Sequence, residues 1–275
     1  MRSRVLKAII KKDLLEVSRN RTAWVPVVII PLVFFVFLPA LFLLLPRLSF
    51  FQSTTMPTNL DPGQVLSVLP EEVKARFAGL SVDQLIPFAI LGYFFAPMFL
   101  VMPLMVSSIV AAESFAGEKE RKTLEGLLYS PTTDAELFTG KALAALLPAV
   151  GFSLLSFVLY TVVINTLGYP IMGRIWFPLP GWWPLIFWIT PAVAFLGVLV
   201  TVLVSARVAT FMEAYQSGGM LVLLVLGLVV GQATGIIYLG VLSGMVIGTI
   251  LWLVDWLLLR FCLRLFSRKV LIGKV

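Results

Sequence analysis

The sequence predicts an all-α polytopic membrane protein, and three observations lead to this class. Sixty per cent of the 275 residues are apolar and only 13 % are charged, with a mean hydropathy of +1.01, which is more apolar than a soluble domain requires. The apolar residues form uncharged runs of about 20 residues or more, the length at which a helix crosses a bilayer. These runs are continuous rather than alternating, which favours helices over a β-barrel.

Six spans account for these runs within a single transmembrane domain, residues 1–275. The longest run, 214–254, is twice the length of one span, so we predict a turn within it at 232–240. The predicted spans are residues 23–46, 85–112, 142–167, 183–206, 215–232 and 241–261. Residues 3–20 form an amphipathic pattern typical of an interfacial helix; a plain charge cluster that orients the chain is the alternative.

Lysine and arginine orient the predicted spans. Seven of the 21 basic residues precede the first span and five lie from residue 260 onward. The positive-inside rule therefore places both termini in the cytoplasm of a cell membrane, which requires an even number of spans. With six spans, 17 basic residues lie inside, so orientation explains the net charge of +7 and no nucleic-acid partner is expected. The first span is too long for a signal peptide and is predicted to be an uncleaved anchor.

The longest external segment, residues 47–84, is predicted to contain a short helix. Pro70 is followed by two acidic residues, a pattern typical of a helix start. Ser81 and Gln84 then match a capping box that leads into the second span.

Tryptophan marks the second external loop, residues 168–183. Trp176, Trp182 and Trp183 lie close to the predicted membrane boundary. Because tryptophan is enriched at membrane interfaces, we predict an aromatic belt here rather than a binding cage.

Proline is frequent in the first two spans, at Pro26, Pro31, Pro39, Pro46, Pro87, Pro97 and Pro103. Membrane helices tolerate proline where neighbouring helices or hydroxyl groups satisfy the freed carbonyls. We therefore expect ordinary packing around them, with kinks that shape a cavity as the alternative.

Glycine recurs every four residues along the last two spans, at Gly227, Gly231, Gly235, Gly240, Gly244 and Gly248. Small residues at this spacing let helix backbones approach closely. The pattern predicts that spans five and six pack on each other or on a second subunit.

Catalytic patterns are missing from the sequence. It contains no histidine, which excludes His-Glu-x-x-His zinc sites and histidine-based triads, and we predict no catalytic residue and no metal site. The phosphate-binding loop is also absent, since Gly140-Lys141 is followed by alanine, so any ATPase must be another chain. The single cysteine, Cys262, has no partner for an internal disulfide.

Polar residues within the spans are few. Asp255 is the only ionisable residue well inside a span, and near Arg260 we expect it to be salt-bridged or solvated rather than part of a proton relay. Uncharged candidates for lining a path are Ser107, Ser108, Asn165, Thr166, Gln232 and Thr234. Hydrogen bonding between helices is the alternative role for each.

The most informative segment is residues 113–131, between spans two and three. As a helix it has one apolar side and one polar side, formed by Leu124, Leu127 and Leu128 and by Glu118, Lys122, Glu125 and Tyr129. Pro131 ends this helix, and Thr133 with Glu136 matches a capping box that starts the next one. Such a helix suits a rigid handle for a partner, and a linker lying on the membrane is the alternative.

At these residues the sequence resembles the permease family of type-two ABC exporters. The shared pattern is Glu120-Arg121-Lys122-Thr123-Leu124-Glu125, then Leu127-Leu128, Ser130-Pro131 and Gly140-Lys141. The resemblance extends over nearly the whole chain, including the N-terminal amphipathic helix, the inner segment 205–218 and the tail 266–271. Glycine is usual in this family where Lys122 stands, and we expect the lysine to make the start of the helix more regular.

The resemblance implies a coupling helix at 113–131 that docks on a separate ABC ATPase subunit. The implied ATPase contacts are Glu113, Glu118, Glu120, Arg121, Lys122, Thr123, Glu125 and Tyr129. The implied anchors in the membrane domain are Leu124, Leu127, Leu128 and Pro131. ATP and Mg would be held by the ATPase, and this chain would hold no cofactor.

The resemblance also implies a dimer, formed by two copies of this chain or by the chain and a paralogue. The path would then lie between the two permeases within the lipid bilayer. A non-transporting membrane sensor or assembly protein that uses the same ATPase contact is the alternative function, and a membrane-embedded enzyme is a third. The residues do not identify the substrate.

Overall fold

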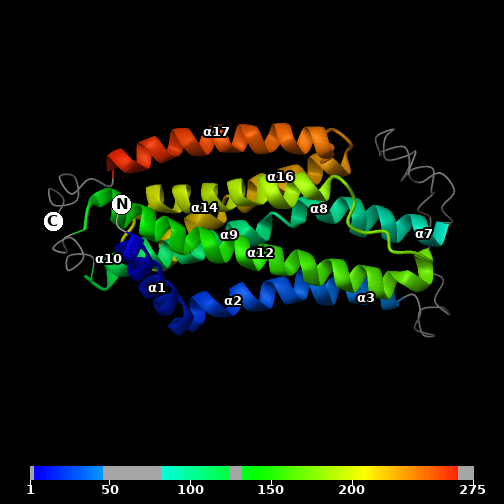
Figure 1. Ribbon diagram of the computed structural model, residues 1–275, viewed down its shortest axis with the longest axis horizontal. Coiled ribbons are helices and arrows are strands. Elements are labelled where there is room, and N and C mark those ends of the chain that lie inside the picture. Colours follow the sequence, from blue (N-terminus) through cyan, green and yellow to red (C-terminus); the bar gives the residue numbers. More distant parts are fainter. Residues whose placement is uncertain (1–2, 46–81, 124–131, 266–275) are drawn as a thin grey trace.

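The computed structural model describes residues 3–45, 82–123 and 132–265, and these ranges contain helices and connecting turns but no strand. The long helices lie along one common axis, and α1 is inclined to it (Figure 1). α1 (Ser3–Arg19), α10 (Glu118–Glu120) and the last residues of α17 (Val241–Leu265) share one end, which we call the α1 end. α7 (Val82–Pro87) lies at the opposite end, the α7 end.

The remaining helical elements, some of them short π-helical segments labelled η, connect these ends. They are α2 (Arg21–Leu32), η1 (Val33–Phe37), α3 (Leu38–Leu44), η3 (Phe88–Phe94), α8 (Phe95–Met98), α9 (Val101–Ala112), η4 (Glu113–Gly117), α12 (Asp134–Met172), α13 (Trp182–Pro184), η5 (Leu185–Ile189), α14 (Thr190–Ser205), α15 (Phe211–Gly219) and α16 (Val222–Ala233).

Six helical stretches in the described ranges are long and apolar enough to cross a membrane. They are Ala23–Leu44, Gln84–Glu120, Asp134–Met172, Trp182–Ser205, Phe211–Ala233 and Val241–Arg264. The predicted all-α polytopic class with six spans is confirmed.

Spans two and three extend well beyond their predicted limits. They contain 37 and 39 residues, against 22 to 24 in the other four. At 1.5 Å per residue each is about 55 Å long, whereas the hydrocarbon core of a bilayer is about 30 Å thick. Both helices therefore protrude past the membrane.

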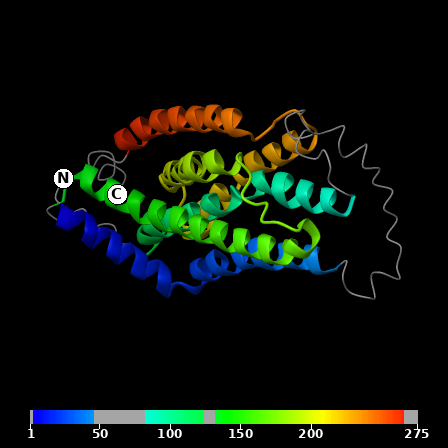
Figure 2. The same ribbon diagram turned by 45° about the vertical axis from the view of Figure 1, so that its right-hand side comes forward.

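The centre of the bundle is formed by α9, α12 and α14, which pack against one another. The peripheral helices α2, α3, α16 and α17 expose apolar side chains such as Leu223, Leu242 and Leu257. Figures 1 and 2 show α17 and the pair α2 and α3 on opposite sides of this centre. In a bilayer these exposed faces meet lipid chains.

The glycines of the last span pack it on span four. A Cβ atom added at Gly244 or Gly248 would come within 3.1 Å of a side chain of α13 or η5. α17 accordingly runs along η5 and α14, whereas α16 packs on α8, η3 and α9. Of the two predicted roles of the glycine stripes, packing of spans five and six on each other is not found in the described chain, and packing on a second subunit stays a prediction.

The other four glycines of the stripes have different surroundings. A Cβ at Gly227 would meet nothing within 4 Å. Gly231 and Gly240 lie against side chains of the turn between α16 and α17, and Gly235 within that turn has a φ of +73°. A left-handed backbone of this kind favours glycine.

The predicted external helix after Pro70 and the predicted capping residue Ser81 lie outside the described residues.

Candidate functional site

The predicted coupling helix, residues 113–131, is not one continuous helix. α9 continues through η4 and α10, so residues 113–120 extend the second span. The helix ends after Glu120, and Lys122 adopts a φ of +57°. The predicted continuous helix over 113–131 is therefore interrupted at 121–123.

The sequence predicts that Lys122 makes the start of the helix more regular, and this prediction is wrong because the helix ends just before this residue. Its backbone lies in the left-handed region, which is strained for a residue with a Cβ atom and is readily adopted by glycine. Glycine is usual at this position in the type-two ABC exporter permeases that the sequence resembles. The left-handed backbone gives a physical reason for that preference.

The capping box predicted at the start of the next helix is confirmed. The Thr133 hydroxyl accepts a hydrogen bond from the Glu136 N–H at 3.2 Å, and the Glu136 carboxylate accepts one from the Thr133 N–H at 3.2 Å. This cap fixes the first turn of α12 and hence the position of Lys141, two turns further along.

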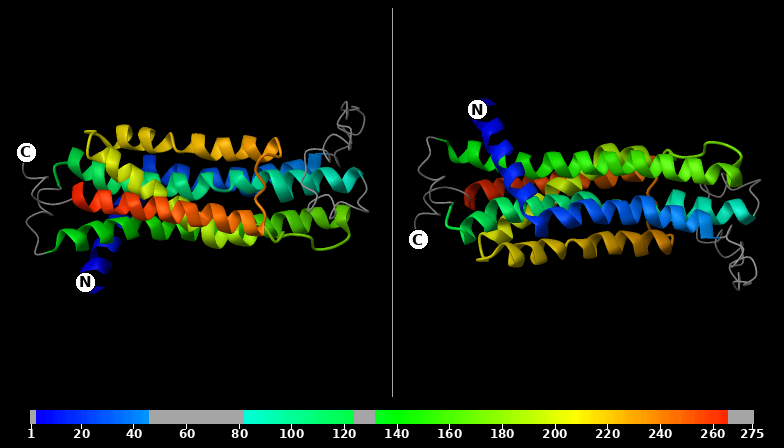
Figure 3. Two further views of the ribbon diagram at one scale, coloured as in Figure 1. Left: turned by 90° about the horizontal axis from the view of Figure 1, so that it is seen from above. Right: turned by 90° about the horizontal axis from the view of Figure 1, so that it is seen from below.

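Seven charged residues converge where α1, the end of span two and the start of α12 meet. We call them the charged junction: Lys12, Asp13, Glu16, Glu113, Glu118, Arg121 and Lys141. Figure 3 shows α1 crossing the bundle at an angle, which brings its side chains to this point. α1 approaches α12 closely because residue 140 is glycine, where a Cβ would lie 2.9 Å from Ile9.

Lys141 is the centre of the charged junction. Its side chain is fully buried, and Nζ donates to Glu118 Oε2 and to the Ser114 carbonyl, both at 2.6 Å. Asp13 Oδ2 lies 3.7 Å from the same Nζ, and Lys12 forms an ion pair with the other oxygen of Glu118. Buried charges persist only when paired in this way, so these side chains depend on one another.

A second set of pairs extends the junction towards water. Arg121 donates to Glu113 Oε1 at 2.7 Å, while the Asn20 amide donates to Glu113 Oε2 at 3.0 Å. Arg121 also lies 3.8 Å from Glu16. Burial alone would lower the pKa of Arg121, but the hydrogen bond and charge of Glu113, with the charges of Glu16 and Glu118, raise it overall.

Lys12 shows the same balance. Burial lowers the pKa of its ammonium group, but the hydrogen bond and charge of Glu118, with the charges of Asp13 and Glu16, outweigh burial and raise the pKa above the ordinary 10.5. Lys12 therefore stays charged at neutral pH.

The end of span two is also bonded to the chain that leads into span five. Glu120 Oε2 accepts from the Phe211 N–H at 2.8 Å, and Lys119 Nζ donates to the Val208 carbonyl at 2.8 Å. Four parts of the chain are thus joined at the α1 end: α1, span two, span three and the start of α15.

The predicted ATPase-contact residues fall into three groups. Glu113 and Glu118 are buried and paired within the chain, which does not fit a direct contact with another subunit. Glu120, Arg121, Lys122 and Thr123 are exposed, and their role stays a prediction. Outside the described residues lie Glu125 and Tyr129, together with the predicted anchors Leu124, Leu127, Leu128 and Pro131.

A second meeting point, without formal charge, lies around three consecutive carbonyl groups of span two. Tyr160 Oη donates to the Leu91 carbonyl at 2.6 Å, Trp182 Nε1 to the Gly92 carbonyl at 2.7 Å, and Gln232 Nε2 to the Tyr93 carbonyl at 2.6 Å. The donors come from spans three, four and five. We call these three carbonyls and three donors the neutral junction.

The local backbone explains why these carbonyls need side-chain donors. They lie in η3, where the π-helical spacing displaces the usual hydrogen bonds. Pro97 follows and has no N–H to offer, either to Tyr93 at α-helical spacing or to Gly92 at π-helical spacing. Donors from neighbouring helices replace the missing bonds, as the sequence analysis expected for membrane prolines.

Two of the three loop tryptophans are not part of an interfacial belt. Trp182 is 1 % exposed and its ring stacks on Tyr160, with centroids 5.4 Å apart, and Trp176 is also buried. Only Trp183, 48 % exposed, fits the predicted belt. Because spans two and three protrude past the start of span four, they enclose the loop 168–183, which the sequence predicts at the membrane surface.

Five of the six predicted path residues make side-chain hydrogen bonds within the chain. Gln232 belongs to the neutral junction, and Asn165 accepts from the backbone N–H groups of Trp176 and Phe177 and donates to the Phe177 carbonyl. Thr234 is exposed and donates to the carbonyl of Val230. The hydroxyl groups of Ser107 and Thr166 also donate to backbone carbonyls of their own helices. The Ser108 hydroxyl is buried and has no hydrogen-bond partner in the described ranges.

Asp255 is neither salt-bridged nor solvated, contrary to expectation. Its side chain is fully buried, and neither carboxylate oxygen has a hydrogen-bond partner within the described ranges. Arg260 instead lies over the Trp256 ring, 3.6 Å from its centroid. Asp255 is therefore a buried carboxyl group inside a membrane span that no described residue pairs.

These features define the chain as a multi-pass α-helical membrane protein whose polar side chains join its spans at the charged junction and at the neutral junction. A family model described as ABC-2 family transporter protein matches residues 7–257, and the chain therefore belongs to this family of transporter permeases. Neither the curated proteins nor the solved structures gave a match to the chain.

Proposed function

We propose that the chain is the permease subunit of an ATP-driven exporter, coupled to a separate ABC ATPase subunit. Family membership supports a transporter permease. The charged junction is the observation that carries the coupling, because it ties the end of span two, and through Arg121 the segment that follows it, to α1 and to the start of α12. A force on that segment would move these elements together.

In this proposal the ATPase holds ATP and Mg and performs the hydrolysis. The exposed residues 120–123 and the chain that follows them meet the ATPase, while the buried carboxylates of Glu113 and Glu118 hold the segment in place. Two permeases, identical or paralogous, form the path between them in the cell membrane. The α1 end and both termini face the cytoplasm in this proposal, and the excess of basic residues near the termini supports that orientation.

The experiment compares two variants of the permease purified with its ATPase. The double variant Lys122→Glu/Glu125→Lys reverses two charges of the segment without changing the net charge. Since opposite charges facing each other across an interface become like charges, we expect about a tenfold or greater loss of ATPase association. Arg174→Glu, exposed in the loop beyond α12, is the matched control and should bind normally.

Reconstitution then separates the possible functions. ATP-dependent movement of a compound across vesicles that contain both subunits would support an exporter. Normal complex formation and transport-linked hydrolysis in the double variant would refute the coupling assignment. A complex that responds to ATP but moves no compound would instead indicate the sensor or assembly function.

A further inference from the structure

Span six meets the rest of the bundle through one narrow stripe. Its buried residues are Gly244, Gly248, Asp255 and Cys262, which recur at intervals of four and seven and so lie on one face of α17. Most other side chains of this helix are exposed. The elements of span four, α13, η5 and α14, pack against the stripe. The face of span six that meets span four thus carries one carboxyl group, that of Asp255.

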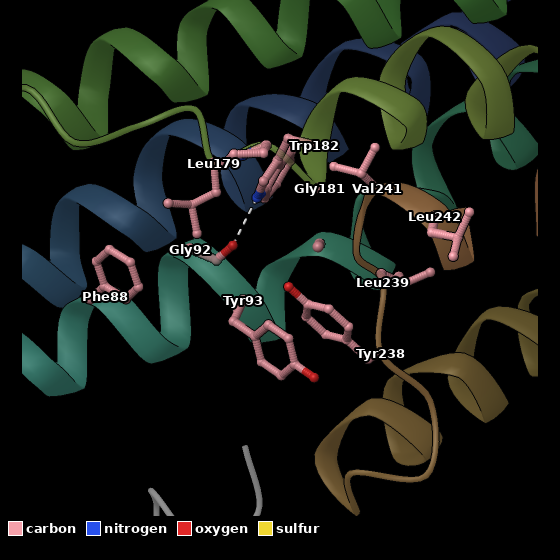
Figure 4. Close-up of a pocket in the computed structure, with 12 residues that line it drawn as sticks. Phe88, Gly92, Tyr93, Leu179, Gly181, Trp182, Tyr238, Leu239, Val241 and Leu242 are labelled. Carbon is pink, nitrogen blue, oxygen red and sulfur yellow. Dashed lines mark hydrogen bonds between the residues drawn. The ribbon is translucent and has the colours of Figure 1, made fainter. Parts of the chain in front are cut away.

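The half of span six towards the α7 end is held firmly. Gly181 lets the start of span four pass the backbone of Leu239, since a Cβ there would lie 2.5 Å from the Leu239 carbonyl oxygen, and Figure 4 shows this crossing. Further along, the Trp188 indole donates to the Thr249 hydroxyl at 3.2 Å, and the Trp252 indole donates to the Trp188 carbonyl at 3.3 Å. Close backbone contact and two hydrogen bonds therefore fix this half on span four.

The half towards the α1 end is held more loosely. Among the described residues beyond Trp252, one α17 side chain hydrogen-bonds to another helix: the Cys262 thiol donates to the Leu199 carbonyl at 3.6 Å. A thiol is a weak donor. Leu258 and Leu259 add partly buried apolar contact. Because segments with few buried contacts open at low free energy, this half separates from span four more readily than the first half.

Asp255 lies in the loosely held half. Its side chain is fully buried, and neither carboxylate oxygen has a hydrogen-bond partner among the described residues. The main neighbours of α17 lie within residues 182–205, which contain no aspartate, glutamate, lysine, arginine or tyrosine. On α17 itself the charged groups are Arg260 and Arg264, both exposed, and Arg260 lies over the Trp256 ring. The described part of the chain thus offers no counter-charge to a carboxylate at this position.

A carboxyl group in these surroundings is far more stable when it is neutral. Moving an ionised carboxylate out of water without a counter-ion costs much more than moving a neutral polar group, so the group neutralises instead. An aspartate neutralises by binding a proton. A cation on a second subunit does not replace the proton in this arrangement, because the side chain of Asp255 is covered by its own chain.

We propose that Asp255 is a proton-binding site that links the packing of span six on span four to pH. The carboxyl holds a proton while the two spans are packed. When the half of span six beyond Trp252 moves away, water reaches Asp255 from the α1 end, which is the nearer one: Arg264 is about 14 Å along the helix and Val241 about 21 Å. The O–H bond then breaks, its electron pair stays on the carboxylate oxygen, and the proton passes to water. The proposal concerns this chain alone and does not depend on a coupled ATPase.

The direction of the pH effect follows from the number of bound protons. An aspartate in water is ionised above about pH 4, so the packed arrangement holds one proton more than the separated one at neutral pH. Raising the pH therefore favours separation, by up to about tenfold for each pH unit while this difference of one proton lasts.

Infrared spectroscopy tests the bound proton. A protonated carboxyl group has a carbonyl stretch that is separate from the carboxylate bands. Spectra of the purified chain in phosphatidylcholine nanodiscs at neutral pH should contain such a band, and Asp255→Asn should remove it. Glu213→Gln changes an exposed carboxylate on α15 and is the matched control, which should keep the band. Identical spectra in this region for the parent and Asp255→Asn would overturn the proton site.

Cys262 reports the separation of the two spans. It is the single cysteine of the chain and is buried on the same face, about two turns beyond Asp255. Its alkylation by a water-soluble maleimide should quicken with pH in every variant, because the thiolate is the reacting form. The ratio of the rates in the parent and in Asp255→Asn cancels that chemistry. This ratio should rise by up to about tenfold per pH unit between about pH 6 and pH 8.

Further variants make the alkylation test decisive. Asp255→Leu should give the same rates as Asp255→Asn, whereas Glu213→Gln should match the parent at each pH. Thermal unfolding of each variant verifies that it folds. A ratio that stays constant with pH, or a Cys262 that is never alkylated, would overturn the link between proton release and separation of the spans.

Discussion

At the α1 end, spans two and three are joined by ion pairs around Lys141, whereas further along the same spans are joined by neutral hydrogen bonds around Gly92. The charged junction lies where the helices extend past the shorter spans and α1 covers them. The neutral junction lies within the length of spans two and three, at the level where span four begins at Trp182 and span five ends just after Gln232, and it uses backbone carbonyls as acceptors. Ion pairs thus join the spans where α1 covers their ends, and neutral hydrogen bonds join them where the apolar spans meet.

The two junctions should also fail differently. Removing Lys141 from the charged junction leaves the buried Glu118 and Asp13 with only the partly exposed Lys12 as a counter-charge, so the loss affects several ion pairs at once. Removing one donor from the neutral junction leaves a single carbonyl without a partner. The following predictions test this difference, from the largest expected effect to the smallest.

Lys141→Met should have the largest effect. It leaves Glu118 and Asp13 buried without their shared cation, which is expected to cost about 3–5 kcal/mol in the free energy of unfolding. The midpoint of thermal unfolding in detergent measures the loss. The double variant Lys141→Met/Glu118→Gln should recover much of it, and an unchanged midpoint in the single variant would show that the network contributes little.

Trp182→Phe should have a smaller effect, confined to one bond and its packing. The Gly92 carbonyl loses its donor, at an expected cost of about 1–3 kcal/mol in the free energy of unfolding. Trp183→Phe, one residue further and 48 % exposed, is the control and should stay within about 0.5 kcal/mol of the parent. Equal effects for both variants would contradict the assignment of Trp182 to the neutral junction.

Asp255→Leu should stabilise the protein. Asp255 is the exception to the pattern of the two junctions, a carboxyl within the span region that no described residue pairs. Replacing it with leucine removes a polar group that costs about 2.5 kcal/mol or more at the centre of a membrane helix. A raised unfolding midpoint, with a smaller rise for Asp255→Asn, is the expected result; a fall would show that the carboxyl has a partner in the assembled protein.

Lys122→Gly should also stabilise the protein, by about 1 kcal/mol, because glycine adopts the left-handed backbone without strain. Lys119→Gly is the matched control within α10 and should destabilise, since glycine weakens a helix. Unfolding midpoints of the two variants should therefore shift in opposite directions. Shifts of the same sign would argue against the left-handed conformation at residue 122.

Alkaline pH should weaken the charged junction alone. The folded-state pKa of Lys12 is raised above 10.5, so its contribution is fully present at neutral pH and is lost as the pH rises from 10.5 through the raised pKa. The effect should be the smallest of the five, because Lys12 is 37 % exposed and water screens its pairs. Lys12→Met should flatten the fall in unfolding midpoint as the pH rises above about 10.5, whereas Trp182→Phe should keep it.

The class and the number of spans could be predicted because span length and hydropathy are properties of continuous runs. The ends of spans two and three could not, since Glu113, Glu118 and Lys141 are charges that a linear sequence assigns to loops. The pairing of Lys141 with Glu118 and Asp13, and of Glu113 with Arg121, lets these charged turns continue a buried helix. Sequence spacing does not reveal pairing across more than 100 residues.

The neutral junction left a partial signal in the sequence. Pro97 indicates that carbonyls one turn earlier need other donors. Tyr160, Trp182 and Gln232 could not be identified as those donors, because they lie on three other spans and their meeting depends on packing. Trp182 was assigned to the membrane surface for the same reason: its burial results from the protruding lengths of its neighbours.

The length of span two has a mechanical consequence. If the helix pivots at Gly92, where three neighbours hold it, the arm towards Glu120 measures about 42 Å and the arm towards Gln84 about 12 Å at 1.5 Å per residue. A displacement of about 4 Å at the long arm then becomes roughly 1 Å at the short arm. Such a lever converts a wide, weak stroke at the α1 end into a short, strong one at the α7 end.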